Sequence, residues 1–228
     1  LYDRQNREIR REGDAEMKDG VSGEKVNIAV FVSGGGTNLQ ALLDAEKDGI
    51  IHSGRIVLVV SDNPSAYALQ RAKNAGKDTA IAEKSGRSQV EFEADLTAVL
   101  KKYNIGLIVL AGFLRILSPS FVKNYENRII NVHPSLIPSF CGKGYYGLRV
   151  HEAALAYGVK VTGATVHFVN EIPDGGKIIM QKAVEIQPDD TPETLQQRVM
   201  REAEWKILPL SAEKVCENML ARGSAANE

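Results

Sequence analysis

The sequence predicts one α/β domain with a single doubly wound, mostly parallel sheet and an antiparallel strand pair in its C-terminal half. Short apolar runs alternate with amphipathic segments of helical period, as in buried strands connected by helices. A glycine loop follows the first apolar run, which is typical of a strand–loop–helix unit. Two later apolar runs are separated by only a short turn, which favours antiparallel pairing.

The N-terminal half is expected to alternate strands and helices. Gly76 follows the second helix as a C′ residue, and Ser88 is placed to cap the third. The expected strands are 26–32, 55–61, 79–82 and 105–110. One expected helix starts near Leu39, and two others span 66–75 and 88–103. This half therefore provides most of the parallel sheet.

The C-terminal half supplies the remaining elements. Thr191 and Pro192 have the N-cap and first-turn proline of a last helix, whose apolar residues recur every fourth position. The other expected elements are strands at 127–132, 161–169 and 177–186 and a helix at 148–157, with the turn 170–176 between the last two strands.

We expect a single folded domain over 25–222. The segment 1–24 is mostly charged with little periodic apolar content, which predicts a disordered arm, or alternatively a helix that docks on a partner subunit. Residues 223–228 are expected to form a tail.

Composition and charge argue against several classes of protein. Lys and Arg total 28 against 29 Asp and Glu, so there is no basic excess for nucleic acid or an anionic membrane. No apolar run approaches the roughly 18 residues of a membrane span, and no signal-peptide core begins the chain. Two cysteines make neither a disulfide framework nor a metal spacing, so a cytoplasmic location is expected.

Asn131 and His133 are the strongest candidates for chemistry. They lie two residues apart at the end of an apolar strand and before a proline-rich turn, so their side chains point the same way. Open α/β sheets place reactive groups at this edge. Asn131 can hold a carbonyl oxygen, and His133 can move a proton or stabilise an oxyanion.

The glycine loop 33–38 is a candidate anion site. Backbone N–H groups of a glycine turn and a helix start bind anions. Leu39 stands where the dinucleotide fingerprint needs glycine, and no lysine follows Gly36 as the phosphate-loop pattern requires. The loop therefore favours a simple phosphate ester, with a ligand-free βα turn as the alternative.

The other histidines are interpreted as structural. His52 lies in a polar turn and His151 on a helix beside a glutamate, so both are expected at the surface. His167 alternates with apolar residues in a strand, as a hydrogen-bonded core histidine does. No cluster of His and Cys has the spacing of metal ligands.

Asp174 and the loop 111–119 have a structural and a functional interpretation. Asp174 lies in an Asp-Gly-Gly hairpin signal, but a carboxylate near His133 would raise the imidazole pKa and hold its tautomer. The loop 111–119 suits an ordinary βα connection, or an apolar wall with backbone groups for a flat heterocycle.

Together and in this order, these motifs resemble the glycinamide ribonucleotide formyltransferases, a folate-dependent formyltransferase family of purine synthesis. The resemblance covers about 26 to 210 and rests on SGGGTNLQ at 33–40, AGFLRIL at 111–117, NVHPSLIP at 131–138, and VHFV at 166–169 followed by DGG at 174–176. It implies a Rossmann-like formyltransferase fold. It also implies an enzyme that moves the formyl group of 10-formyltetrahydrofolate to the amine of glycinamide ribonucleotide, giving formylglycinamide ribonucleotide and tetrahydrofolate on the de novo route to IMP.

The resemblance also implies roles for individual residues. Asn131, His133 and Asp174 match the catalytic trio, in which Asp174 would keep His133 protonated beside the oxyanion. The phosphate would bind at Gly36, Thr37 and Asn38, the rest of the nucleotide at Gly112, Phe113 and Glu204, and the folate at Leu114, Arg115, Ile116, Leu117 and Asn170. Glu204 would contact the ribose hydroxyls. No metal is implied, and a monomer or a homodimer is expected.

Two positions and one loop depart from the family pattern. Trp205 stands where many relatives have histidine, and Gln89 where relatives carry a folate-contacting arginine, for which Arg87 is a nearby substitute. The loop 139–147 is a longer version of the segment that many members carry.

Three alternative functions stay open at this point. A methionyl-tRNA formyltransferase would carry a further C-terminal domain, whereas about 18 residues follow Leu210, and the near-neutral charge does not favour tRNA. A formyltetrahydrofolate hydrolase would carry an N-terminal regulatory domain, for which the arm is too short. A non-enzymatic nucleotide-binding module would need only the glycine loop.

Overall fold

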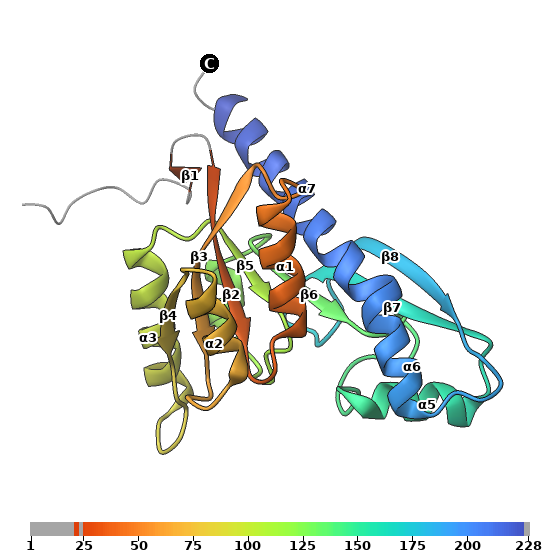
Figure 1. Ribbon diagram of the computed structural model, residues 1–228. Coiled ribbons are helices and arrows are strands. Elements are labelled where there is room, and N and C mark those ends of the chain that lie inside the picture. The colour runs from red at the N-terminus through yellow and green to blue at the C-terminus, as the bar shows by residue number, and fades with distance from the viewer. Residues whose placement is uncertain (1–20, 23–24, 226–228) are drawn as a thin grey trace, which may run out of the picture.

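Eight strands form one sheet with the order β4-β3-β2-β5-β6-β7-β8, and β1 pairs with β2 at its start (Figure 1). This computed structural model describes residues 21–22 and 25–225. The strands are β1 (Val21–Ser22), β2 (Lys25–Val32), β3 (Gly54–Ser61), β4 (Asp78–Ile81), β5 (Leu107–Leu110), β6 (Ile129–His133), β7 (Val161–Phe168) and β8 (Ile178–Glu185). The strands from β4 to β6 pair in parallel, whereas β7 pairs antiparallel with both β6 and β8. The predicted fold class, including the antiparallel pair, is therefore confirmed.

Helices connect the strands close to the predicted positions. They are α1 (Thr37–Lys47), α2 (Tyr67–Asn74), α3 (Gln89–Lys102), α4 (Pro119–Asn124), α5 (Leu148–Tyr157), α6 (Pro192–Val199), the π-helical segment η1 (Met200–Glu204) and α7 (Trp205–Ala225). Ser88 and Thr191 form capping boxes at the starts of α3 and α6, as expected for these N-cap residues. The short strand β1 and the segment η1 were not predicted.

The expected ends of the domain differ from the helices and strands observed. Most of the predicted arm, 1–24, lies outside the described residues, but its residues Val21 and Ser22 form β1. Helix α7 continues to Ala225, past the expected domain end at 222. None of the helices in the described part of the chain combines the length and the apolar character needed to cross a membrane.

The sheet is buried on both faces because its central strands are almost continuously apolar. In β2, Ile28 and Val30 contribute to the core beneath α1 and α7, whereas Ala29 and Phe31 contribute to the core beneath α3 and α4. Such two-sided burial is expected of parallel strands covered by helices. This burial makes the strands a rigid scaffold, and the loops at their carboxyl ends can then carry functional residues.

The strand order reverses at β2, which lies between β3 and β5. Doubly wound sheets bind ligands at such a switch point. Here the loops after β2 and β5 are joined directly, because Ser33 N–H donates to Gly112 O at 3.2 Å and Leu114 N–H donates to Ser33 Oγ at 2.9 Å. The glycine loop and the predicted heterocycle wall therefore lie side by side.

Candidate active site

Folding brings Asn131, His133 and Asp174 together at the end of β6. His133 Nδ1 lies 3.5 Å from Asp174 Oδ2, although 41 positions separate the two residues (174 − 133). Asn131 and His133 alternate with buried Val132, so both side chains extend from the same face of the strand. The proximity that the sequence could not show is thus present in the structure.

The loop between β7 and β8 turns back on itself to present Asp174. Asp174 has a positive φ of 56°, and Gly142 N–H donates to its Oδ2 at 2.8 Å. A side chain at Gly176 would place its Cβ 1.7 Å from Phe168 O, so only glycine allows the chain to pass there. The Asp-Gly-Gly sequence therefore serves two purposes: Gly176 allows the shape of this loop, and Asp174 supplies its carboxylate.

Backbone carbonyls determine which ring nitrogens carry protons. His133 Nε2 lies 2.8 Å from Phe140 O, and His167 Nδ1 lies 2.8 Å from Phe168 O. Because a carbonyl oxygen only accepts, both of these nitrogens must be the donors. When His133 is neutral, its Nδ1 is consequently the unprotonated nitrogen, and it faces Asp174.

Burial affects the charge of His133 more strongly than its neighbours do. Burial lowers the pKa of His133, and the opposing effects of Asp174 and of the Phe140 carbonyl do not restore it to its usual value. In the free protein Asp174 thus raises the pKa of His133, as predicted, but burial outweighs its effect. Asp174 itself stays ionised: burial raises its pKa, but the neighbouring imidazoles of His167 and His133 and the Gly142 amide together lower it further.

His167 is buried as predicted, but it also contacts two members of the trio. Its Nε2 lies 3.2 Å from Asn131 Nδ2 and 3.6 Å from Asp174 Oδ1. Since His167 Nδ1 is the donor to Phe168 O, the Nε2 lone pair accepts a hydrogen bond from Asn131 Nδ2. This contact orients the amide of Asn131. It follows from the pairing of Asn131 with His167 between β6 and β7, so a correct register prediction would have found it.

His151 corrects an expectation. It was expected at the surface, but its side chain is fully buried on α5, and both ring nitrogens lack a hydrogen-bond partner among the described residues. Burial, together with the nearby His133, lowers its pKa to about 4. His151 is therefore neutral at physiological pH. The surface position of His52 is confirmed.

The glycine loop leads into a free helix start. The first intrahelical bond of α1 runs from Gln40 N–H to Gly36 O, so the N–H groups of Thr37 and Asn38 have no partner within the helix. Arg71 donates from Nε to Gly35 O at 2.9 Å and brings a positive charge beside the loop. These features fit an anion, as the sequence predicted.

The side chain of Asn38 has a partner within the protein. Its side chain turns inward and donates from Nδ2 to Glu204 Oε2 at 2.7 Å, so only its backbone N–H remains for a phosphate. This bond connects the phosphate loop with Glu204, at the end of the π-helical segment η1. Segments of this type occur frequently at functional sites.

Replacing Gly36 with alanine is expected to damage this loop. The new Cβ would lie 2.6 Å from Ala68 Cβ, and Gly36 has a positive φ of 74°. We expect the free energy of unfolding to fall by about 1–3 kcal/mol and phosphate-ester binding to weaken. Urea denaturation and calorimetric titration measure both effects. Gly35→Ala is the matched control, since nothing lies within 4 Å of the position that its Cβ would take; equal damage there would contradict this interpretation.

The residues assigned to the folate lie on loops beside the trio. Leu114 and Ile116 are 67% and 77% exposed, whereas Leu117 is buried and Arg115 Nε pairs with Asp62 Oδ2 at 2.6 Å. Asn170 shapes the loop of Asp174, because its side chain donates to Gly175 O. The exposed aliphatic side chains offer an apolar surface that a flat ring would cover.

The two positions near the start of α3 have partners of their own. Gln89 Nε2 donates to Ile116 O at 3.2 Å and so supports the predicted folate wall. Arg87 pairs with Asp95 of α3 at 2.6 Å. Gln89, rather than Arg87, therefore contacts this loop.

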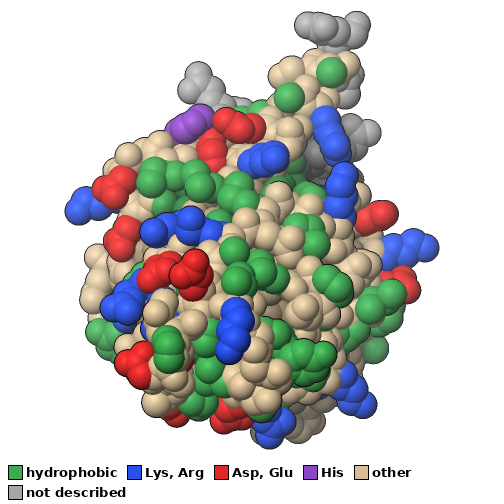
Figure 2. All heavy atoms as spheres, turned by 90° about the vertical axis from the view of Figure 1, so that its right-hand side faces the viewer, with side chains coloured by type: hydrophobic (Ala, Val, Ile, Leu, Met, Phe, Trp, Pro, Cys, Tyr) green, Lys and Arg blue, Asp and Glu red, His purple; other side chains and the backbone are tan. Residues whose placement is uncertain are grey.

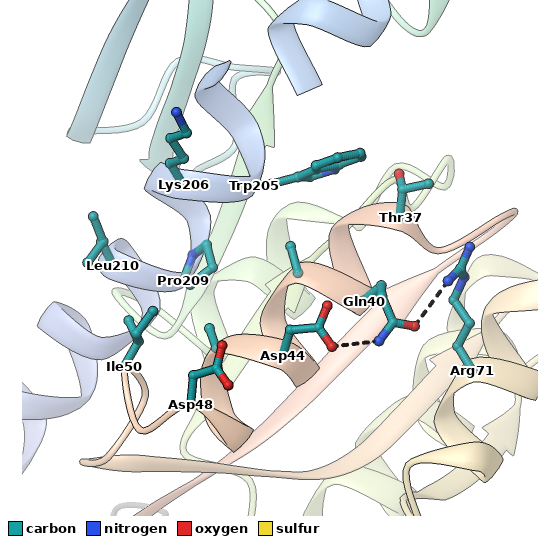
Figure 3. A pocket seen from close by; sticks show the side chains of 12 residues that line it. Thr37, Gln40, Asp44, Asp48, Ile50, Arg71, Trp205, Lys206, Pro209 and Leu210 are labelled. Atoms are coloured by element: carbon teal, nitrogen blue, oxygen red, sulfur yellow. Dashed lines mark hydrogen bonds between the residues drawn. The ribbon is translucent and has the colours of Figure 1, made fainter. Parts of the chain in front are cut away.

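A groove of about 530 Å³ runs between α1 and α7 from the phosphate loop (Figure 3). Thr37 and Trp205 face each other at one end, and Arg71 is tied to Gln40 at the rim. The trio does not line this groove. The groove therefore adjoins the nucleotide side of the candidate site, and the reacting groups lie outside it.

Outside the trio, three further side chains with possible metal-ligand atoms lie close together. His52, Glu213 and Glu217 place one ligand atom each within 4.8 Å of one another, away from the trio. Glu213, however, already accepts hydrogen bonds from the backbone N–H groups of His52 and Ser53. The Glu213 carboxylate thus stabilises the loop that precedes β3.

Comparisons with known proteins agree with these features. The family described as formyl transferase matches residues 26–211. A phosphoribosylglycinamide formyltransferase of Haemophilus influenzae is 41% identical over 80% of this chain and 84% of its own length. A crystal structure of glycinamide ribonucleotide transformylase 1 from Symbiobacterium toebii has a TM-score of 0.80 and 39% identity, covering 88% of this chain and 94% of that one.

A longer relative shows the same similarity over part of its length. The trifunctional purine biosynthetic protein adenosine-3 of Gallus gallus is 44% identical over 88% of this chain. The chain spans only 19% of that relative.

Proposed function

Because the chain belongs to the formyl transferase family, we propose that it is a phosphoribosylglycinamide formyltransferase. It transfers the formyl group of 10-formyltetrahydrofolate to the amine of glycinamide ribonucleotide, on the de novo route to IMP. The observation that carries this proposal is the approach of Asp174 to His133, 3.5 Å apart at the sheet edge that also holds the phosphate loop. The expected cytoplasmic location and the monomeric or homodimeric state stay predictions.

The trio supplies the chemistry of formyl transfer. Asn131, oriented by His167, donates its second Nδ2 hydrogen to the formyl oxygen, on which negative charge develops as the amine attacks the carbon. His133 Nδ1 takes the proton that the amine loses, and ionised Asp174 stabilises the imidazolium that forms. The same proton then passes to the leaving folate nitrogen as its bond to the formyl carbon breaks. His133 finishes neutral, which is the state that its burial favours.

The two substrates have complementary surfaces to occupy. The N–H groups at the start of α1 and Arg71 bind the 5′-phosphate, and Glu204 accepts hydrogen bonds from the ribose hydroxyls. The folate ring covers Leu114 and Ile116, whose exposure fits an apolar partner. This arrangement holds the amine and the formyl carbon near His133 without any metal in the mechanism.

Glu204 is expected to favour substrate binding at a cost in stability. Burial raises the pKa of Glu204 to about 7, against the effect of the Asn38 amide. Because the pKa of this carboxyl is higher in the folded than in the unfolded state, the free energy of unfolding falls as pH rises from the unfolded-state pKa toward 7. Above pH 7 the loss amounts to roughly 3 kcal/mol. Glu204→Gln should therefore gain stability relative to the parent between pH 5 and pH 8, while nucleotide affinity falls.

Urea denaturation at both pH values and calorimetric titration of glycinamide ribonucleotide check this prediction. Glu202→Gln is the matched control, because Glu202 is exposed in the same segment η1. An unchanged pH dependence in Glu204→Gln would show that the Glu204 carboxyl does not limit stability.

One assay tests the proposed activity. The protein is incubated with 10-formyltetrahydrofolate, with and without glycinamide ribonucleotide, and the folate product is followed. We expect tetrahydrofolate to form only when the acceptor is present. Turnover without the acceptor would indicate a hydrolase, and no turnover with it would refute the transferase.

A further inference from the structure

A second cavity, of about 310 Å³, lies between the last turns of α7 and the ends of β7 and β8. Its charged lining is wholly basic, with Lys177, Lys214 and Arg222, and two amide side chains, Asn127 and Asn218, complete its polar groups. Apolar side chains of β7, β8 and α7 line the rest. Figure 2 shows basic side chains gathered at the foot of the projecting end of α7 on this face.

Helix α7 separates its charges between two sides. Lys214, Asn218 and Arg222 recur every fourth residue and so share one side, which borders the cavity. Glu213 and Glu217 lie instead beside His52. Among the described residues neither glutamate forms an ion pair with Lys214 or Arg222, although Glu217 lies three positions after Lys214.

The polar side chains of the cavity have no hydrogen-bond or ion-pair partner within the described part of the chain. Arg198 and Lys77, by contrast, pair with Asp190 and Glu46. The three cationic side chains are exposed, so water screens them from one another, and the whole chain has a net charge of only -1. An anion at the cavity would meet three cations and two amide donors on one surface.

We propose that this cavity is a second anion site, which binds a ligand carrying several phosphate groups. Three cations and two amides suit the negative charge and the many acceptor oxygens of a triphosphate, and the apolar part of the lining can contact the remainder of such a ligand. The site is separate from the phosphate loop, which lies after β2 at the switch point of the sheet.

The cavity is connected to the trio through the loop of Asp174. Phe168 N–H donates to Lys177 O at 2.9 Å and closes the base of that loop. Both residues line the cavity. A ligand held by Lys177 from the loop and by Lys214 and Arg222 from α7 therefore ties the base of the loop to the helix.

Calorimetric titration of the full chain with tripolyphosphate, at low salt and without divalent metal, tests the proposal. Glycinamide ribonucleotide is present at saturation to occupy the phosphate loop. We expect one ligand per chain, with affinity reduced at least about tenfold in the double variant Lys214→Ala/Arg222→Ala. Lys206→Ala is the control, because Lys206 lies on α7 but borders the groove toward α1 instead.

A parallel titration with ATP separates the two sources of a triphosphate group. Tighter binding of ATP than of tripolyphosphate supports a nucleotide site, and equal binding supports a site for phosphates alone. No binding by the parent protein would overturn the proposal. Equal affinity in the parent and the double variant, or an equal loss in Lys206→Ala, would overturn it as well.

Discussion

Replacing Asp174 with asparagine is expected to lower kcat by about 10³-fold. Asparagine has the same shape and can still accept the hydrogen bond from Gly142 N–H, so the loop should keep its conformation. What it lacks is the negative charge that stabilises the imidazolium of His133. The Kd of glycinamide ribonucleotide should change by less than about threefold, since Asp174 does not contact the phosphate loop. Single-turnover kinetics and calorimetric titration measure the two quantities.

The pH profile of the same variant distinguishes a charge effect from a structural one. Asp174 raises the pKa of His133, so removing its charge should lower that pKa further. In our mechanism neutral His133 accepts the proton, and activity is lost as pH falls through its pKa. The acidic limb of kcat/KM should therefore move to lower pH in Asp174→Asn. Exposed Asp189→Asn is the control, and an equal loss of nucleotide binding and kcat would indicate that Asp174 is structural.

Replacing His133 with alanine is the second change with a large expected effect. It removes both the proton acceptor and the positive charge beside the oxyanion, so kcat should fall by about 10²–10⁴-fold. Because His133 and Asp174 act as one unit, the double variant with Asp174→Asn should lose little more than either single variant. Rapid-quench measurements on the three variants test this non-additivity.

Exposed His52→Ala supplies the comparison, since it removes a histidine on the side of the molecule away from the trio. Additive losses in the double variant would mean that His133 and Asp174 act independently. A His133→Ala variant with unchanged function would favour the non-enzymatic nucleotide-binding module.

Local pattern was sufficient to predict the fold. The strands β2 and β3 are recognisable from their apolar runs, which are buried on both faces. The helix starts at Ser88 and Thr191 are recognisable from their N-cap residues, so in both cases a few neighbouring residues are sufficient. The short element β1 was missed because it pairs two residues within a segment of otherwise charged composition. The segment η1 has no local signal and ends at Glu204, which bonds with Asn38 on another helix.

The candidate site depends more on contacts between distant residues. Asn131 and His133 were found because a strand end places them together, but the approach of Asp174 depends on how the loop 169–177 turns back. The burial of His151 and the contact of His167 with Asn131 depend on tertiary packing, which helix or strand periodicity does not encode. The lowered pKa of His133 depends on tertiary packing in the same way, since burial opposes the effect of its partner.

The most direct test of the account follows the formyl carbon itself. Formyl-labelled [¹³C]10-formyltetrahydrofolate and glycinamide ribonucleotide are mixed with the parent protein or with Asp174→Asn, and the nucleotide product is analysed by mass spectrometry. We predict one labelled carbon in each formylglycinamide ribonucleotide formed by the parent, and a rate about 10³-fold lower in the variant. Unlabelled nucleotide together with labelled free formate, or equal rates in the two proteins, would contradict formyl transfer by Asn131, His133 and Asp174.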